Sequence, residues 1–179
     1  MMVKDSARLS YELITRDDAG LLYELDNDPE VMRYITGGKV STMDDIQNIY
    51  LPRMESYVNE AKGWGLWKVT VKESNDFIGW VLVRPMEFFS DSPEYDNIEL
   101  GWRFMQKAWG KGFATEAARA VKEALIQDSN PSYLTAIAED ENLGSINIMK
   151  KLGMEYIKTY LHKDPLGDAE LVYYQLKLA

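Results

Sequence analysis

The stretch that decides the fold is Ile98-Glu99-Leu100-Gly101-Trp102-Arg103-Phe104, followed closely by Trp109-Gly110-Lys111-Gly112-Phe113-Ala114-Thr115-Glu116. Its first half alternates apolar and polar residues and predicts a strand, and its second half predicts a glycine turn that opens a helix over residues 113–127. Two glycines one residue apart let a ligand approach the backbone closely. The unpaired N–H groups of the helix's first turn then face that ligand with partial positive charge. The stretch therefore predicts a strand, a turn suited to an anion, and a helix.

Two common nucleotide-binding patterns do not fit this turn. No Gly-Lys-Ser/Thr follows a four-residue spacer, as a Walker loop requires, and the third glycine of the dinucleotide fingerprint is absent. Lys111 adds a formal positive charge beside the helix start. A plain strand-to-helix connection would show the same two glycines, so the turn alone leaves both interpretations open.

Outward from this stretch, the chain alternates between strand and helix signals. Period-two patterns predict strands over residues 9–13, 66–71, 77–84, 98–105, 133–138, 154–160 and 171–177. Capping residues and apolar periodicity predict helices after residues 17–18, after Pro29, from residue 41 onward with a kink at Pro52, and over residues 145–152. Residues 85–96 read as a long polar loop. This order predicts an α/β fold, with a mixed sheet and helices on both faces, in a single domain over residues 1–179.

The composition excludes several kinds of chemistry. The 179 residues contain no cysteine and one histidine, so disulfides, thiolate sites and a three-histidine zinc site are excluded, and we expect no metal. The net charge of −9 argues against nucleic-acid or anionic-membrane partners. No apolar run approaches the ~20 residues of a membrane span, and the first residues carry no secretory pattern, so we expect a cytoplasmic protein.

Four motifs, in the same order and spacing, resemble the GCN5-related N-acetyltransferase (GNAT) superfamily. The first, Trp109-x-x-Gly112-x-Ala114, is similar to its acyl-CoA motif Q/R-x-x-G-x-G/A, with Trp in place of Gln or Arg. With this Trp, residues 109–117 as a whole resemble the RimJ/RimL-like, ribosomal-protein-alanine acetyltransferase branch. The other three are residues 8–19, residues 28–34, and Asn142-x-x-Ser145 with Lys151-Leu152-Gly153-Met154. The resemblance covers about residues 8–178.

The resemblance implies a central sheet of about seven mostly antiparallel strands, with one splayed pair that holds acetyl-CoA as co-substrate. Gly101 inside its strand is consistent with a bulge that starts the splay. Asn142 is equally readable as a helix cap, and the two roles are compatible. The residues implied to bind the co-substrate are Phe104, Trp109, Gly110, Lys111, Gly112, Phe113, Ala114, Thr115, Asn142, Ser145 and Lys151.

Two residues are candidates for proton transfer. An amine is mostly protonated near neutral pH, and Glu99 is the candidate base, since related members carry a glutamate on this strand. Its alternative is a solvated or salt-bridged strand residue, paired with Arg103 on the same face. Ser145 is the candidate acid by resemblance, because Ile148 and Met149 occupy the neighbourhood in which many members carry a tyrosine.

The leading hypothesis is an acetyl-CoA-dependent N-acetyltransferase that acts on a primary amine by direct attack. The acceptor is a protein N-terminal α-amino group or a small-molecule amine, and a homodimer is possible. The alternative is a non-catalytic acyl-CoA-binding sensor or regulatory module. Trp102 shares a strand face with Leu100 and Phe104, unless a bulge at Gly101 turns it toward the acceptor.

Overall fold

A seven-stranded sheet forms the centre of the computed structural model, which describes residues 1–178. The strand order is β1-β2-β3-β4-β5-β7-β6, and every neighbouring pair is antiparallel except β4 and β5. This confirms the predicted mixed sheet. The strands are β1 (Leu9–Leu13), β2 (Gly65–Val71), β3 (Asp76–Met86), β4 (Glu94–Phe104), β5 (Tyr133–Ala138), β6 (Glu155–His162) and β7 (Ala169–Lys177).

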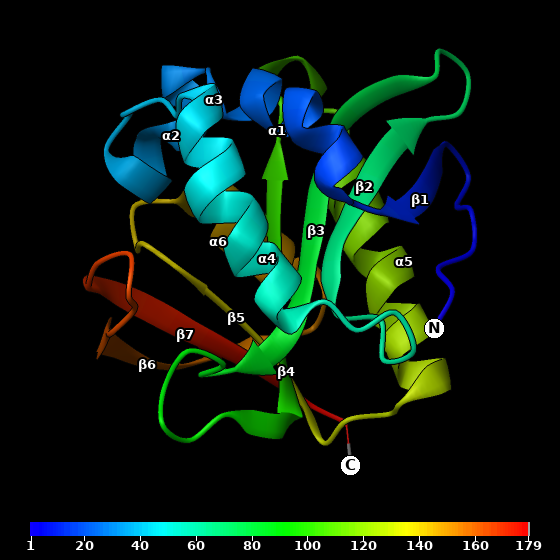
Figure 1. The fold of residues 1–179 in the computed structure, drawn as a ribbon. Helices are drawn as coiled ribbons and strands as arrows, with labels where there is room; N and C mark the ends of the chain where they lie inside the picture. Colours follow the sequence, from blue (N-terminus) through cyan, green and yellow to red (C-terminus); the bar gives the residue numbers. More distant parts are fainter. Residues whose placement is uncertain (179) are drawn as a thin grey trace.

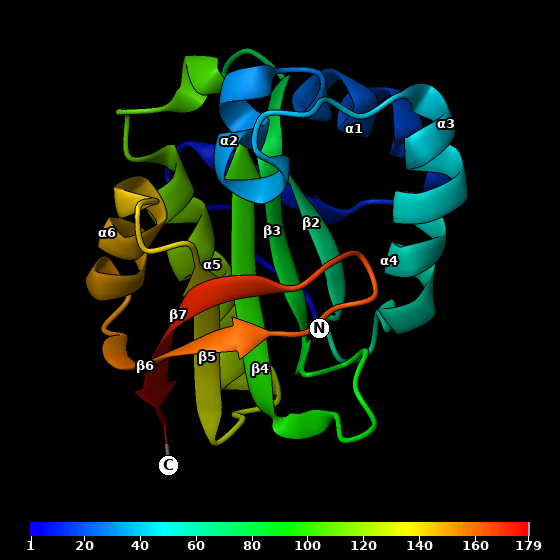
Figure 2. The ribbon, with the colours of Figure 1, turned by 90° about the vertical axis from the view of Figure 1, so that its left-hand side faces the viewer.

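Helices cover both faces of the sheet, as predicted (Figure 1 and Figure 2). On one face, here called the α2 face, lie α1 (Ala19–Asp26), α2 (Pro29–Thr36), α3 (Met43–Asp45) and α4 (Leu51–Tyr57). The opposite face, the α5 face, carries α5 (Phe113–Asp128) and α6 (Leu143–Lys151). The small apolar stripe of α5 packs fully buried against the sheet in the main core, through Ala117, Ala118, Val121 and Leu125.

The helix that begins at the Thr42 capping box changes character before Pro52. A π-helical segment, Ile46–Tyr50, connects α3 to α4, and Pro52 then occupies the first turn of α4. Proline has no N–H to donate and its ring clashes with the preceding turn, so a local widening of the helix accommodates it. The helix continues past Pro52 without a break, and the irregularity near Pro52 is this π-helical segment. Within residues 1–178, no helix is long and apolar enough to cross a bilayer.

The splay that the resemblance implied lies between β4 and β5. Their parallel pairing covers only Asn97 with Tyr133, Ile98 with Leu134, and Glu99 with Thr135. From residues 100 and 136 onward the two strands no longer pair with each other. The predicted bulge at Gly101 is wrong. Gly101 pairs in regular register with Leu82 of β3, so the splay results from the early end of the β4–β5 ladder.

The loop expected over residues 85–96 is shorter than predicted. β3 continues through Pro85 to Met86, β4 begins at Glu94, and the register shift between these strands falls between Pro85 and Met86. A bulge is where a strand tolerates proline, because the ladder there does not need its missing N–H. The loop is also less polar than expected, since Phe88 and Phe89 pack against the second core cluster.

Candidate active site

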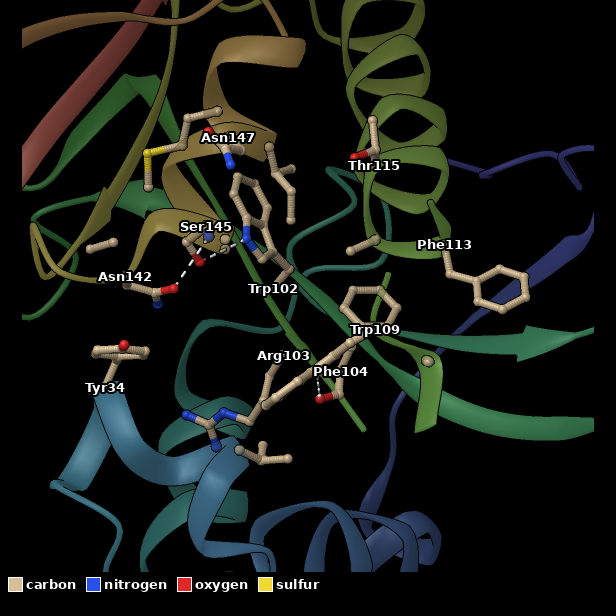
Figure 3. A pocket seen from close by; sticks show the side chains of 18 of the residues that line it. Tyr34, Trp102, Arg103, Phe104, Trp109, Phe113, Thr115, Asn142, Ser145 and Asn147 are labelled. Carbon is tan, nitrogen blue, oxygen red and sulfur yellow. Dashed lines mark hydrogen bonds between the residues drawn. The ribbon is translucent and has the colours of Figure 1, made fainter. Parts of the chain in front are cut away.

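One large cleft, about 750 Å³ in volume, opens where β4 and β5 separate. Its size is within the range of small-molecule and cofactor sites. The walls are the unpaired end of β4, the end of β5, the first turn of α5, and α6, with α2 across the front (Figure 3). The cleft therefore runs from the α5 face, through the gap in the sheet, to the α2 face.

At the α5 end, the glycine turn, residues 109–112, is built for backbone contact. Gly110 and Gly112 have φ of +72° and +78°, in the left-handed region that other residues rarely adopt. Gly112 is the N-cap of α5, and no side chain caps the helix. The N–H groups of the first helical turn therefore remain available to an anion, which fits the predicted phosphate site.

A side chain that the sequence analysis missed supports this turn. Arg8, just before β1, donates to the Lys111 carbonyl (2.9 Å) and to the Glu116 carboxylate (2.7 Å), and its guanidinium lies 4.2 Å from the centre of the Phe113 ring. Burial raises the pKa of Glu116, but hydrogen bonds from Arg8 and Ser6 outweigh burial and leave that pKa below its ordinary value. The sequence places residue 8 more than 100 positions away from this turn, and no motif signals the contact.

Ten of the eleven predicted co-substrate residues line the cleft, and Lys111 does not. Lys111 is exposed, and its contribution to the turn is the carbonyl that Arg8 binds. Trp109, which replaces the usual Gln or Arg, donates its indole N–H to the Phe104 carbonyl (3.0 Å) and leaves 46% of its surface exposed. The substituted residue therefore supports the end of β4 beside the cleft.

The opposite wall comes from α6. Asn142 is the N-cap of this helix, and its Oδ1 accepts from the Ser145 backbone N–H (3.2 Å) while its side chain lines the cleft. Both interpretations of Asn142 therefore fit the structure. Ser145 Oγ accepts a hydrogen bond from Trp102 Nε1 (3.1 Å) across the splay (Figure 3). Lys151 lies at the C-terminal end of α6 and completes this wall.

The α2 end of the cleft contains residues that the sequence analysis did not assign to the site. Arg103 bonds to the buried Asp26 of α1 (2.9 Å), and its guanidinium stands 4.9 Å from the centre of a Trp80 ring. Tyr34 of α2 lies across from Arg103 (Figure 3). Strand alternation already placed Arg103 on the face opposite Trp102, but only the packing of α1 and α2 shows that this face borders the cleft.

Glu99 lies outside the large cleft. The residue is buried, with 6% of its surface exposed, and Arg84 of β3 donates to its carboxylate (Nε to Oε2, 2.8 Å). Glu99 is therefore in a salt bridge, as the alternative interpretation predicted. The predicted partner was wrong, because Arg84 binds Glu99 while Arg103 binds Asp26. The Leu82 side chain leans over Gly101, 3.3 Å from the place a Cβ would take, and so lies at the boundary between the cleft and Glu99.

Beyond Leu82, Glu99 borders a second cavity of about 10 Å³, which is room for about one water molecule. Charged groups also line it from the β3–β4 loop (Glu87) and from the β6–β7 turn (Lys163 and Asp164), and Arg53 of α4 binds Asp164. Burial opposes the charge of Arg84, but Glu99 outweighs it and raises the pKa of the guanidinium above its ordinary value. Burial also raises the pKa of Tyr57 to about 12. His162 is half-buried here, with its Nδ1 2.9 Å from the Tyr160 hydroxyl.

The charges around the large cleft favour an anionic ligand. Its charged lining residues are Glu30, Arg33, Arg103 and Lys151. Arg103 is paired with Asp26, so two further cations stand against one anion in a chain of net charge −9. The pyrophosphate of an acyl-CoA suits such a cleft, with its phosphates at the glycine turn. Among residues 1–178, no group of three or more histidine or acidic side chains is arranged to hold a metal ion.

A cleft between splayed strands, with a glycine turn at a helix N-terminus, is the arrangement that the resemblance to acyl-CoA-dependent transferases implied. The family model described as an acetyltransferase (GNAT) domain matches residues 8–155, and the chain belongs to this family. A curated relative, the uncharacterized protein YkkB of Bacillus subtilis, is 30% identical over 88% of this chain and 87% of its own length.

Solved structures of this family share the fold. The acetyltransferase (GNAT family) from Bacillus anthracis is 25% identical, with a TM-score of 0.76 over 99% of this chain and 98% of its own. RimL, a ribosomal L7/L12 α-N-protein acetyltransferase solved with coenzyme A, has a TM-score of 0.76 over 99% and 98% of the two chains. Its sequence identity is 9%, so this likeness shows the fold alone and leaves the predicted RimJ/RimL-like branch unconfirmed.

Proposed function

We propose that this protein is an acetyl-CoA-dependent N-acetyltransferase that transfers the acetyl group to a primary amine by direct attack. The observation that carries the proposal is the course of the cleft, whose lining begins at the glycine turn on the α5 face and ends at α2 on the other face. A long acyl-CoA with its phosphates at the turn extends its thioester through the gap in the sheet. The acceptor amine then approaches from the α2 face.

Each wall of the cleft has a distinct part in this reaction. The α5 N-terminus holds the phosphates, and the unpaired edge of β4, near Phe104, offers backbone groups to the pantetheine arm. Ser145 and Asn142 border the far wall, where the sulfur departs. Holding thioester and amine together in one cleft supplies much of the rate enhancement, because it removes the entropy cost of their encounter.

We assign proton removal from the amine to Glu99, which lies one same-face position before Gly101 of the cleft lining. Because its carboxylate is itself outside that lining, the proton would pass through an intervening water. A second route leads from the open α2 end of the cleft to bulk solvent. The sulfur needs only modest assistance, because a thiolate is a good leaving group. Ser145 is the candidate donor of a hydrogen bond to that sulfur.

The experiment that tests the proposal is release of CoA from acetyl-CoA in the presence of a panel of amines. The chain contains no cysteine, so a thiol reagent detects only the CoA that is produced. The panel should contain peptides with free N-termini, amino acids, polyamines and aminoglycosides. We expect amine-dependent release together with acetylated product by mass spectrometry. Binding of acetyl-CoA without release for any amine would instead support a non-catalytic acyl-CoA-binding module.

A further inference from the structure

Trp102 and Ser145 join the two walls of the cleft at the point where the sheet opens. Trp102 belongs to the end of β4 that no longer pairs with β5, and Ser145 belongs to the first turn of α6. The indole Nε1 lies 3.1 Å from the serine Oγ (Figure 3). Both residues line the cleft. The hydrogen bond therefore spans the gap that the β4–β5 ladder no longer closes.

The chemistry of the two groups sets the direction of this hydrogen bond. An indole N–H is a donor only, so Ser145 Oγ must accept, and the serine keeps one hydrogen of its own to donate. In the described part of the chain, that hydroxyl donates to no protein acceptor. The Ser145 backbone N–H is bound by Asn142 Oδ1, which fixes the residue in the first turn of α6. The serine is thus held at two points, with its hydroxyl hydrogen free for a ligand in the cleft.

We infer that Trp102 is a positioning residue for the leaving group: it orients the Ser145 hydroxyl so that its hydrogen is donated to the CoA sulfur. This inference rests on the proposed acetyltransferase function. In the reaction, the amine nitrogen bonds to the acetyl carbon, and the carbon–sulfur bond breaks with its electron pair going to sulfur. The amine loses one proton and the sulfur gains one, so the products are an amide and CoA thiol. The oriented hydroxyl stabilises the negative charge on sulfur between these events.

The ionisation of bound CoA tests this role without turnover. A hydrogen bond to a thiolate favours its charged form, so the thiol of bound CoA should have a pKa below that of free CoA. We expect the affinity for CoA, relative to desulfo-CoA, to increase as the pH rises through the pKa of the bound thiol toward that of the free thiol, by up to tenfold for each unit by which binding lowers this pKa. Desulfo-CoA has no thiol and therefore cancels the titration of protein groups and phosphates.

Trp102→Phe and Ser145→Ala should each abolish this extra increase, because each removes a part of the same donor arrangement. Trp67→Phe is the matched control, since it removes an indole hydrogen bond of similar length (Nε1 to the Gly63 carbonyl, 2.9 Å) in β2. The control variant should lose stability but keep the pH response. Loss of the response in Ser145→Ala but not in Trp102→Phe would overturn the role of Trp102. If the wild type bound CoA but its relative affinity did not increase with pH, this inference would be overturned while the proposed function would stand.

Turnover gives an independent measurement on the best amine of the panel. Trp102→Phe should lower kcat about three- to tenfold, but less than twofold when Ser145 is already alanine, because the two residues act as one unit. Equal losses in both backgrounds would mean that Trp102 acts on packing alone and would contradict the inference. If the wild type bound neither acetyl-CoA nor CoA, the proposed function would fail first, and this inference with it.

Discussion

Glu99 shows how one neighbouring side chain decides what a residue can reach. It alternates with Leu100 as predicted and belongs to the same strand face as Gly101 and Arg103. Same-face neighbours on a strand are ~7 Å apart, so Glu99 is one step beyond the cleft lining. Leu82 fills the space above Gly101, and Arg84 binds the carboxylate. A base at this position acts through water, not by direct contact with the amine.

Glu99→Gln tests the base assignment at the scale of one residue. If this carboxylate receives the proton of the amine, kcat should fall by ~10²- to 10⁴-fold with little change in acetyl-CoA affinity. Raising the pH should restore part of the loss, because more of the amine is then already neutral. The measurement is a pH series of kcat and KM. A raised amine KM with normal kcat would mean that Glu99 only attracts a cationic acceptor, and unchanged kinetics would assign the proton to bulk solvent.

At the scale of the element, the first turn of α5 should carry most of the cofactor affinity. Gly112→Glu places a carboxylate where we expect phosphate, so acetyl-CoA should no longer stabilise the variant against heat. The wild type should gain ~2.7 kcal/mol at a ligand concentration one hundred times Kd. Gly112→Ala is the matched control, since it carries the same backbone strain at φ +78° without the charge. A full thermal shift in folded Gly112→Glu would show that the phosphates bind elsewhere.

The contact between Arg8, just before β1, and the start of α5 leads to a second prediction. Arg8→Gln removes the guanidinium that holds the Lys111 carbonyl and Glu116, so the Kd for acetyl-CoA should rise about three- to tenfold. The effect should shrink at high salt, because the Arg8 side chain is 44% exposed and salt screens its charge. Titration calorimetry measures it. Arg16→Gln breaks an exposed arginine–glutamate pair with Glu55 on the other face and should leave Kd unchanged.

At the scale of the whole molecule, the Arg53–Asp164 pair ties α4 to the β6–β7 turn (2.6 Å, side chains 16% and 13% exposed). Burial alone would raise the pKa of Asp164, but hydrogen bonds from Arg53 and the Leu166 N–H outweigh it, so that pKa is below its ordinary value. A carboxyl with a depressed folded pKa stabilises fully above its unfolded pKa. This stabilisation disappears as the pH falls through the folded value.

Asp164→Asn should therefore lower the free energy of unfolding by ~2–3 kcal/mol at pH 7, less than the ~3–5 kcal/mol cost of breaking a fully buried pair, because both side chains are partly exposed. The difference from wild type should shrink as the pH falls below the ordinary carboxyl range of ~4. Denaturant unfolding at pH 7, 5 and 3 measures both values. Asp91→Asn, at an exposed position in the β3–β4 loop, is the control. A difference that stays constant across this pH range would mean that the ion pair is not its source.

The sequence by itself determined the order of the elements and the glycine turn that opens α5. Alternation and capping are local signals, so the strands, the Thr42 cap and the start of α5 at Phe113 were predicted correctly. The need for glycine at residues 110 and 112 is also local, because it depends on their own backbone angles. Motif spacing added the family, which the domain match confirms.

Only the tertiary structure decided which side chains meet. The Arg84 partner of Glu99, the contact of Arg8 with the glycine turn, and the Trp102–Ser145 hydrogen bond all join segments distant in sequence. The splay likewise depends on where β5 stops pairing with β4, not on a glycine within either strand. Such contacts depend on sheet register and on how helices pack, and a linear pattern contains neither.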